Sequence, residues 1–319
     1  MKALRIVGAA VVALVVVYFL AALALIYWPA EIFKDRSPPP APAGADYPHA
    51  ERRFVARDGK QLFARAFGPA AETTILLVHG FGVNSAAYQG AATAWAEASG
   101  ARVLALDLRG HGQSDGKPGR LDDYGQYETD LADVIGALRN EGARKIVLAG
   151  HSMGGGVVLT YAQKPEVAPD AYLLIAPLLG RDAPTAPVTG GPAAIPPNLY
   201  VRTPRIIGVV MLTVLRIHAF DDLPMMYLNQ TPPMTYGLNA IISMAPVDYR
   251  AAFRAINTPL LLVAGSNDEV FRAAAYADVV KEYSDGRSVL VDGASHVSVL
   301  ADPSAVAEIA AFIATVRRP

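Results

Sequence analysis

The sequence predicts an α/β fold in which a mostly parallel central sheet is covered by helices on both faces. Short, continuously apolar segments alternate with helical patterns, which is typical of buried parallel strands. Hydrophobic residues make up 52% of the 319 residues and charged residues 18%, enough apolar material for one large core. The expected strands are residues 74–78, 102–106, 145–149, 172–176, 260–264 and 288–291. The expected helices are residues 87–98, 122–140, 153–162, 272–282 and 304–316.

The amino-terminal segment has the composition of a transmembrane helix. Residues 6–28 carry no charge, and at ~1.5 Å per residue they can cross a hydrocarbon core of ~30 Å. Lys2 and Arg5 precede this segment. Trp28 ends it, as expected for an aromatic residue at the membrane–water interface. We therefore expect residues 1–30 to anchor the chain, with a cytoplasmic amino terminus. The remainder would lie outside the cytoplasm, in the periplasm if the source is a Gram-negative bacterium.

A cleaved signal peptide is the alternative, which would make the protein secreted. Ala22-Leu23-Ala24 resembles a cleavage site, but the apolar run is longer than the usual apolar region of a signal peptide and continues past this site. A third interpretation is a buried core helix, but this segment has no polar face, which argues against it.

The rest of the chain divides into a linker and one large domain. Residues 31–50 contain the proline-rich stretch 37–44, which predicts an extended spacer. Residues 51–319 form the folded domain, beginning with a hairpin around Asp58-Gly59. Residues 178–247 interrupt the alternation of strands and helices and contain five of the seven methionines, which predicts an inserted cap.

Composition excludes several classes of function. The net charge is −1, from 28 basic and 29 acidic residues, so no nucleic-acid partner is expected. There is no cysteine, which excludes disulfides, thiolate metal sites and a cysteine nucleophile. We expect no cofactor and no metal.

A candidate nucleophile lies in Gly150-His151-Ser152-Met153-Gly154, between an expected strand and an expected helix. Glycines two residues before and after Ser152 permit a tight strand-to-helix turn that exposes the hydroxyl. A glycine-rich phosphate loop is the alternative, but the lysine and spacing of that motif are missing.

Two backbone N–H groups are candidates for an oxyanion hole. Met153 follows the candidate nucleophile at a helix start, and Phe81 lies in the loop after the first parallel strand. We expect His79, in the same loop, to be structural.

The candidate base is His296, which follows the last expected strand, and the candidate acid is Asp268, which follows the strand before it. Asp268 could instead cap the next helix. Glu269 is expected to point elsewhere, and Asp292 ranks third. Farther upstream, we expect Asp107 and Arg109 to tie together loops near the site.

These segments together resemble the α/β-hydrolase superfamily. The resemblance rests on residues 77–82, 107–114, 150–155, 265–268 and 293–296, and covers nearly all of residues 51–319. The Asp107-Leu108-Arg109-Gly110-His111-Gly112 and Gly150-His151-Ser152-Met153-Gly154-Gly155 segments are most similar to the monoacylglycerol lipase, lysophospholipase and serine aminopeptidase-like group.

The resemblance implies a serine hydrolase with Ser152, Asp268 and His296 as its triad. We expect a membrane-tethered enzyme that cleaves carboxylic esters, of monoacylglycerol or lysophospholipid type, because the methionine-rich cap suits an acyl chain. A peptidase or amidase, an acyltransferase and a non-catalytic receptor for a small ligand remain alternatives.

Overall fold

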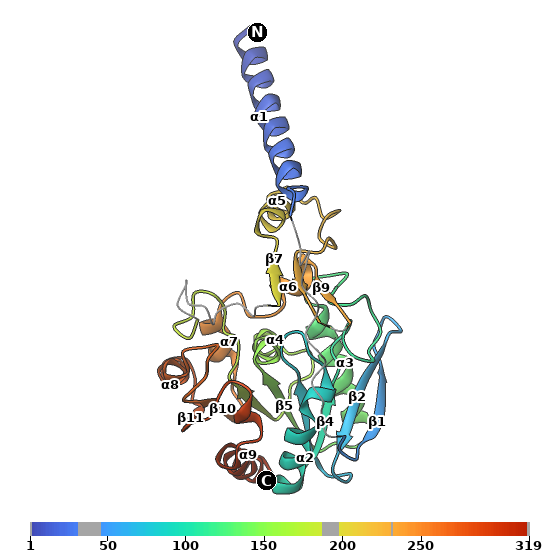
Figure 1. Ribbon diagram of the computed structural model, residues 1–319, viewed down its shortest axis with the longest axis vertical. Coiled ribbons are helices and arrows are strands. Elements are labelled where there is room, and N and C mark those ends of the chain that lie inside the picture. Colours follow the sequence, from blue (N-terminus) through green and yellow to red (C-terminus); the bar gives the residue numbers. More distant parts are fainter. Residues whose placement is uncertain (1, 31–45, 187–197, 231, 318–319) are drawn as a thin grey trace.

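The computed structural model describes residues 2–30, 46–186, 198–230 and 232–317. They form an eight-stranded sheet, a small three-stranded sheet and the helices around them (Figure 1). The strands of the large sheet are β1 (Ala50–Val55), β2 (Gln61–Phe67), β3 (Thr73–Val78), β4 (Arg102–Leu106), β5 (Lys145–His151), β6 (Ala171–Ile175), β10 (Leu260–Gly265) and β11 (Arg287–Val291).

The large sheet is mostly parallel, as predicted. Its order is β1-β2-β4-β3-β5-β6-β10-β11, in which β1 and β2 form the predicted hairpin and β2 is antiparallel to β4. Every other neighbouring pair is parallel. The carboxyl ends of β3, β5, β6, β10 and β11 therefore meet at one edge, where the loops carrying the candidate residues begin.

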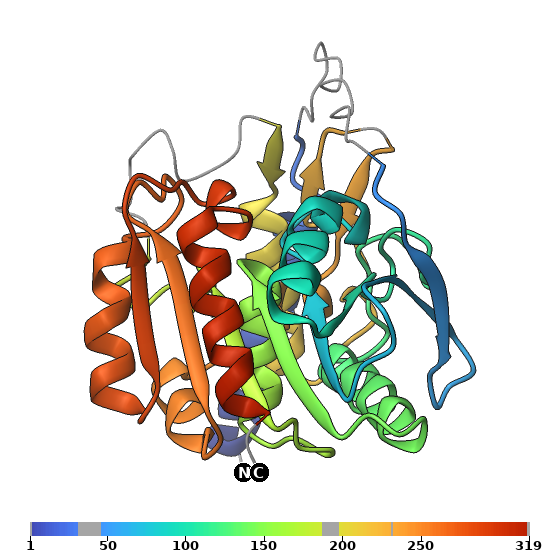
Figure 2. The same cartoon turned by 90° about the horizontal axis from the view of Figure 1, so that it is seen from below.

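Side chains of the central strands alternate between two apolar clusters, one on each face. Leu76 and Leu148 pack under the helices at residues 126–140, 153–162, 249–255 and 276–283, whereas Leu77 and Ala149 pack under those at residues 89–99 (α2) and 303–316 (α9). Figure 2 shows α2 and α9 lying side by side on their face of the sheet. The helices are α2 (Gln89–Ser99), α3 (Gln126–Asn140), α4 (Met153–Ala162), α7 (Tyr249–Ala255), α8 (Tyr276–Tyr283) and α9 (Pro303–Val316), with 3-10 turns η1 (Ser85–Tyr88), η2 (Ala273–Ala275) and η3 (Ser298–Leu300).

Three of the expected helices begin later than the sequence pattern indicated. The helix expected from residue 87 begins at Gln89, after the turn η1. The helix expected from residue 122 begins at Gln126, because Gly125 before it has a left-handed φ of 86°. The helix expected from residue 272 begins at Tyr276, after the separate turn η2. The helix at residues 153–162 has the predicted bounds.

The cap segment (residues 178–247) contains its own small sheet between β6 and α7. Its order is β7-β8-β9 and both pairs are antiparallel. The elements of this segment are β7 (Leu199–Val201), α5 (Thr203–Val214), β8 (Met226–Leu228), β9 (Met234–Tyr236) and α6 (Leu238–Ile242). As a domain boundary, residues 178–247 stay a prediction.

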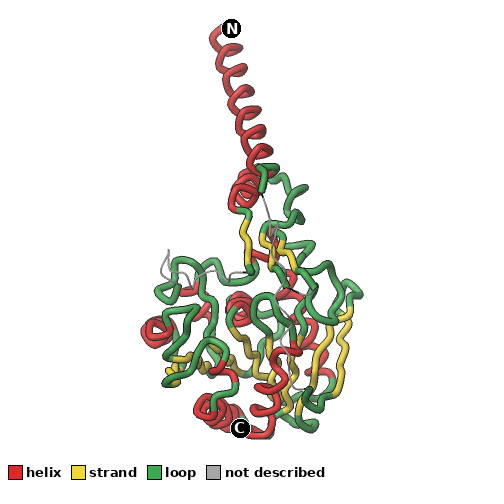
Figure 3. The backbone as a smooth tube through the Cα atoms, viewed as in Figure 1, coloured by secondary structure: helices red, strands yellow, loops and turns green. Residues whose placement is uncertain are grey.

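The first helix, α1 (Lys2–Ile26), projects from the body along the longest axis (Figure 3). Among the described residues, one helix is long and apolar enough to cross a membrane, by length and composition alone: Arg5–Ile26, with a mean hydropathy of 2.9. Only its final turns pack on the body, where Ala22 and Ile26 are fully buried beside α5. The predicted proline-rich stretch at residues 37–44 lies outside the described residues.

Candidate active site

Ser152 occupies a strained turn between β5 and α4. Its φ of 54° and ψ of −120° are rare for a residue with a side chain and indicate local strain. The turn is too tight for side chains at its glycines. A β-carbon on Gly150 would lie 2.4 Å from the Gly154 carbonyl oxygen, and one on Gly154 would lie 2.3 Å from that of Val78. The backbone therefore presents Ser152 at the carboxyl edge of the sheet, as the sequence pattern predicted.

The structure brings Asp268 and His296 together at the same edge. Asp268 follows β10, His296 follows β11, and Asp268 Oδ2 lies 2.9 Å from His296 Nδ1. Both are buried, with side chains 0% and 8% exposed. Burial acts to raise the pKa of Asp268, but the hydrogen bond and charge of His296 outweigh it, helped by two backbone N–H groups. The pKa of Asp268 therefore lies below its ordinary value, and this carboxylate stays ionised.

The second oxygen of Asp268 holds the loop. Oδ1 accepts the N–H groups of Val270 and Phe271, each at 2.8 Å. The alternative role as a cap of the next helix is not seen, because α8 begins only at Tyr276. One carboxylate thus orders its own loop and orients His296.

Two other acidic residues near His296, Glu269 and Asp292, differ in whether they contact it. Glu269, expected to point elsewhere, instead accepts the backbone N–H of His296 at 2.9 Å, so that expectation is wrong. A flexible side chain folds back here because it can satisfy a half-buried amide across the loop. Asp292 accepts from Ser266 Oγ at 3.2 Å, and among the described residues it has no hydrogen bond to His296.

His151 connects Ser152 to the loop of His296. Its Nε2 lies 3.0 Å from the His296 carbonyl oxygen, and its Nδ1 lies 2.7 Å from the Tyr88 hydroxyl. A carbonyl can only accept, so Nε2 carries the proton and Nδ1 accepts from Tyr88. Burial, with a smaller contribution from His296, lowers the pKa of His151 to about 3, which keeps the ring neutral and this arrangement fixed.

The candidate oxyanion loop lies against Ser152. A β-carbon on Gly80 would be 3.4 Å from that of Ser152. The N–H of Gly80 donates to the Tyr88 hydroxyl at 2.7 Å, and the N–H of Gly82 donates to the Tyr236 hydroxyl at 3.0 Å. Within the described part of the chain, the N–H groups of Phe81 and Met153 have no hydrogen-bond partner. Both N–H groups are therefore free to donate, and the oxyanion hole formed by them stays a prediction.

The structural role predicted for His79 is confirmed. The Leu108 N–H donates to His79 Nε2 at 3.1 Å, so Nδ1 carries the proton and donates to the Gly80 carbonyl at 2.8 Å. Burial lowers the pKa of His79 to about 4. His79 therefore joins the candidate oxyanion loop to the loop after β4 as a neutral ring.

The tying roles predicted for Asp107 and Arg109 are also confirmed. Arg109 donates to Asp130 Oδ1 at 2.6 Å and to Asp58 Oδ2 at 2.6 Å, which joins the hairpin turn to α3. Asp107 accepts the N–H groups of Ser85 and Gln113 at 2.6 and 2.8 Å.

The sequence analysis did not predict the contacts of four residues near the site: Tyr88, His151, Glu269 and Tyr236. Each acts through a hydrogen bond to a residue distant in sequence, so no local pattern points to it. Among the described residues, no group of three or more histidine, aspartate or glutamate side chains is placed to hold a metal ion.

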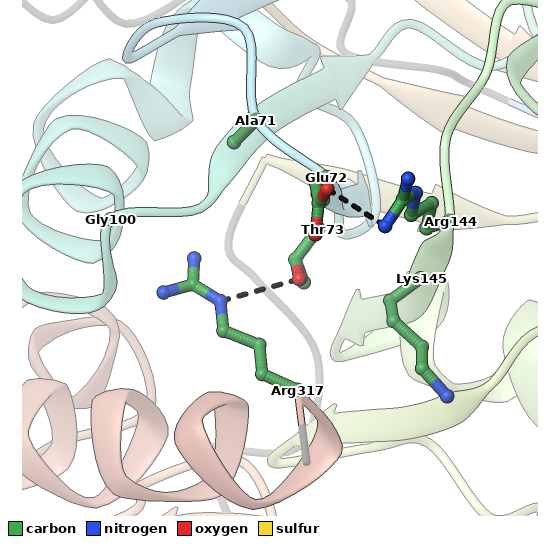
Figure 4. A pocket seen from close by; sticks show the side chains of 7 residues that line it. All are labelled: Ala71, Glu72, Thr73, Gly100, Arg144, Lys145 and Arg317. Atoms are coloured by element: carbon green, nitrogen blue, oxygen red, sulfur yellow. Dashed lines mark hydrogen bonds and ion pairs between the residues drawn. The ribbon is translucent and has the colours of Figure 1, made fainter. Parts of the chain in front are cut away.

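A cavity of about 450 Å³ lies at the opposite, amino edge of the sheet (Figure 4). Its charged side chains are already paired. Arg144 lies 3.0 Å from Glu72, Lys145 lies 3.6 Å from Asp170, and Arg317 donates to Thr73 Oγ1 at 3.3 Å. None of the candidate triad residues lines this cavity.

Comparison with known proteins relates this site to hydrolases. A sequence profile of the serine aminopeptidase S33 family matches residues 69–303. The monoacylglycerol lipase of Mycolicibacterium smegmatis is 28% identical over 248 residues, which cover 70% of this chain and 81% of that protein.

Solved structures show the same fold. A membrane phospholipase A aligns over 100% of both chains with a TM-score of 0.58 and 21% identity. An esterase of Pyrococcus furiosus aligns over 88% of this chain and 97% of its own, with a TM-score of 0.57 and 15% identity. The likeness shows the α/β-hydrolase fold.

Proposed function

The chain belongs to the serine aminopeptidase S33 family of hydrolases, and on this premise we propose that it is a membrane-tethered enzyme that cleaves acyl esters through a covalent intermediate on Ser152. One observation carries the proposal: the buried 2.9 Å hydrogen bond between Asp268 and His296. His151, which precedes Ser152 in its strained turn, holds the loop of His296 next to that turn. A serine becomes nucleophilic only next to a base that is itself oriented, and this arrangement supplies both groups.

The proposed reaction has two halves, acylation and deacylation of Ser152, and the same side chains act in both. His296 Nε2 takes the hydroxyl proton as Ser152 Oγ attacks the ester carbonyl, while ionised Asp268 stabilises the resulting imidazolium. The N–H groups of Phe81 and Met153 hold the oxyanion. His296 returns the proton to the leaving alcohol, which leaves an acyl-enzyme. Water then attacks the acyl carbonyl as His296 takes a proton from it. The bond to Ser152 Oγ breaks, the acid leaves, and His296 returns the proton to Oγ.

The cap segment supports an apolar acyl group as substrate. Met226 and Met234, on β8 and β9, are partly buried and pack against the same apolar cluster as Phe81. Methionine side chains fit acyl chains of varied shape. The relative in Mycolicibacterium smegmatis is a monoacylglycerol lipase, which agrees with a lipid-like ester. A monoacylglycerol or lysophospholipid is the substrate class we propose.

Membrane tethering is supported by how α1 meets α5. A β-carbon on Gly208 of α5 would lie 2.5 Å from the Ala22 carbonyl oxygen, so the two helices approach as closely as glycine allows. Arg205 Nε donates to the Ile26 carbonyl oxygen at 3.0 Å. Ala22 belongs to the possible cleavage site, so cleavage there would remove part of a buried contact. This favours an uncleaved anchor over a signal peptide.

The exposed side of α5 extends the apolar surface of α1. Ile207, Val210 and Val214 are 48%, 43% and 72% exposed. This face suits the lipid boundary next to a membrane-spanning helix. The basic residues Lys2 and Arg5 place the amino terminus in the cytoplasm in our proposal, and the hydrolase domain outside it.

The substrate class is tested with the full chain in detergent. We expect turnover of p-nitrophenyl esters to exceed that of aminoacyl anilides at least 100-fold, and chain length to change kcat/KM. A preference for anilides would identify a peptidase instead, in line with other members of the family. Binding of an ester analogue without turnover would identify a receptor.

Tethering is tested by alkaline carbonate extraction of membranes and by the intact mass of the mature chain. We expect the protein to stay in the membrane fraction with residues 22–24 present. Release into the supernatant with a new amino terminus after Ala24 would contradict the anchor.

A further inference from the structure

Tyr236 is a cap residue that touches the candidate oxyanion loop directly. It ends β9, it is 0% exposed, and its ring stacks on that of Phe81 with centroids 4.7 Å apart. Its hydroxyl accepts the N–H of Gly82 at 3.0 Å. The residue after Phe81 is therefore held by the cap segment and not by the large sheet.

His111 fixes the direction of this contact. Its Nδ1 lies 3.0 Å from the Arg109 carbonyl oxygen and so carries the proton, which leaves Nε2, 3.2 Å from the Tyr236 hydroxyl, to accept. Burial, with a contribution from His79, lowers the pKa of His111 to about 3, so the ring stays neutral. The Tyr236 hydroxyl thus donates to His111 and keeps its lone pair for Gly82.

The same arrangement recurs on the other side of Phe81. The Gly80 N–H donates to the Tyr88 hydroxyl, which donates to His151. A tyrosine–histidine pair therefore holds each amide that flanks Phe81. One pair comes from the core, and the other includes a residue from the cap segment.

The fit between the cap segment and this loop is close. Gly82 has a φ of 74°, and a β-carbon there would lie 2.2 Å from Leu228 Cδ2 on β8. Gly119 has a φ of 64°, and a β-carbon there would lie 2.2 Å from the Thr235 carbonyl oxygen on β9. Because both loops are shaped to the small sheet, movement of that sheet would change the loop that carries Phe81.

We propose that Tyr236 is a positioning residue for the oxyanion hole, which is complete only while β9 is docked. This inference rests on the proposed function. Tyr236 acts through Gly82 on the direction of the Phe81 N–H and does not touch the substrate's reacting atoms. Docking of the cap segment thereby becomes a condition for catalysis.

The test is Tyr236→Phe, which keeps the stacked ring and removes only the hydroxyl. Loss of a whole oxyanion donor costs about 10²–10³ in kcat, so we expect a misdirected donor to lower kcat about 10-fold with KM changed less than 2-fold. Tyr161→Phe is the matched control. The Tyr161 hydroxyl, like that of Tyr236, accepts one backbone N–H, that of Val167 at 3.1 Å, and it donates to the Val167 carbonyl at 2.7 Å, away from the site. Equal kcat values for the two variants would overturn the proposal.

Hydrogen exchange at residues 79–84 gives a second readout that does not need turnover. We expect Tyr236→Phe to speed exchange of the Gly82 amide at least 10-fold, and Tyr161→Phe to leave it unchanged. Unchanged exchange in Tyr236→Phe would overturn the role of Tyr236 even in an active enzyme. If the wild-type chain hydrolyses no ester, the proposed function fails, and the exchange rates alone then decide whether Tyr236 holds the loop.

Discussion

The hydrolase core and the cap segment with α1 hold their residues by different means. In the core, parallel strands deliver Ser152, Asp268 and His296 to one edge, and buried hydrogen bonds lock their loops. The described part of the cap segment has three strands of three residues each, and the final turns of α1 pack against its helix α5, most closely at Gly208.

Because of this difference, we expect substitutions in the two regions to have different effects. Backbone pairing across eight strands fixes the candidate chemistry tightly, so changes there should alter rate by orders of magnitude. The described strands of the cap segment are short, so changes there should alter stability and the supply of substrate. Tyr236 is the exception, because it belongs to the cap segment and contacts a loop of the core.

The largest effect is expected from Asp268→Asn. The amide can keep the loop contacts to Val270 and Phe271 but cannot stabilise an imidazolium, so kcat should fall about 10⁴-fold with little change in folding. Steady-state kinetics with a p-nitrophenyl ester measure it. Asp292→Asn is the control and should retain activity, because Asp292 bonds only Ser266 among the described residues. Comparable losses in both variants would argue against Asp268 as the acid.

The second largest effect is expected from acidification, which should destabilise the core. His79, His111 and His151 have pKa values lowered to about 4, 3 and 3 by burial, against an ordinary 6.5. Between about pH 6.5 and 4 the unfolded chain binds protons that the folded chain does not, so the free energy of unfolding falls as pH falls. Each histidine should contribute about 1 kcal/mol between pH 7.5 and 5.5. Urea unfolding at the two pH values measures it, and equal stabilities would contradict neutral buried rings.

Smaller effects on stability are expected from alanine substitutions at two helical glycines, and the two effects should have opposite signs. A β-carbon on Gly136 of α3 would meet nothing within 4 Å, so Gly136→Ala should stabilise the protein by about 0.5–1 kcal/mol. Gly208→Ala should instead destabilise it by about 1–2 kcal/mol, because α1 must move away from α5. Thermal unfolding of both variants in the same detergent measures the difference. Stabilisation by Gly208→Ala would mean that α1 does not pack there.

The smallest effect is expected at the amino edge of the sheet. Arg144 and Glu72 form an exposed ion pair, with side chains 74% and 71% exposed, far from Ser152. Arg144→Ala should change kcat/KM less than 2-fold, since exposed pairs contribute little. A 10-fold loss of esterase activity would show that this edge takes part in the function.

The hydrolase core and the cap segment also differ in how much of each could be predicted from the sequence. The core strands and α4 were predicted closely, because continuous apolar runs and the glycines around Ser152 are local signals. The loops of Asp268 and His296 followed from the strands before them. The three-residue strands of the cap segment are too short to show a period. The contacts of Tyr88, His151, Glu269 and Tyr236 depend on tertiary placement, which no spacing encodes.

Labelling of the purified full-length chain with a fluorophosphonate, read by intact mass and peptide mapping, tests the central claim most directly. Our account predicts one adduct, on Ser152, and none in Ser152→Ala folded to the same extent. Equal labelling of Ser152→Ala, or no labelling of the folded wild-type chain, would contradict it.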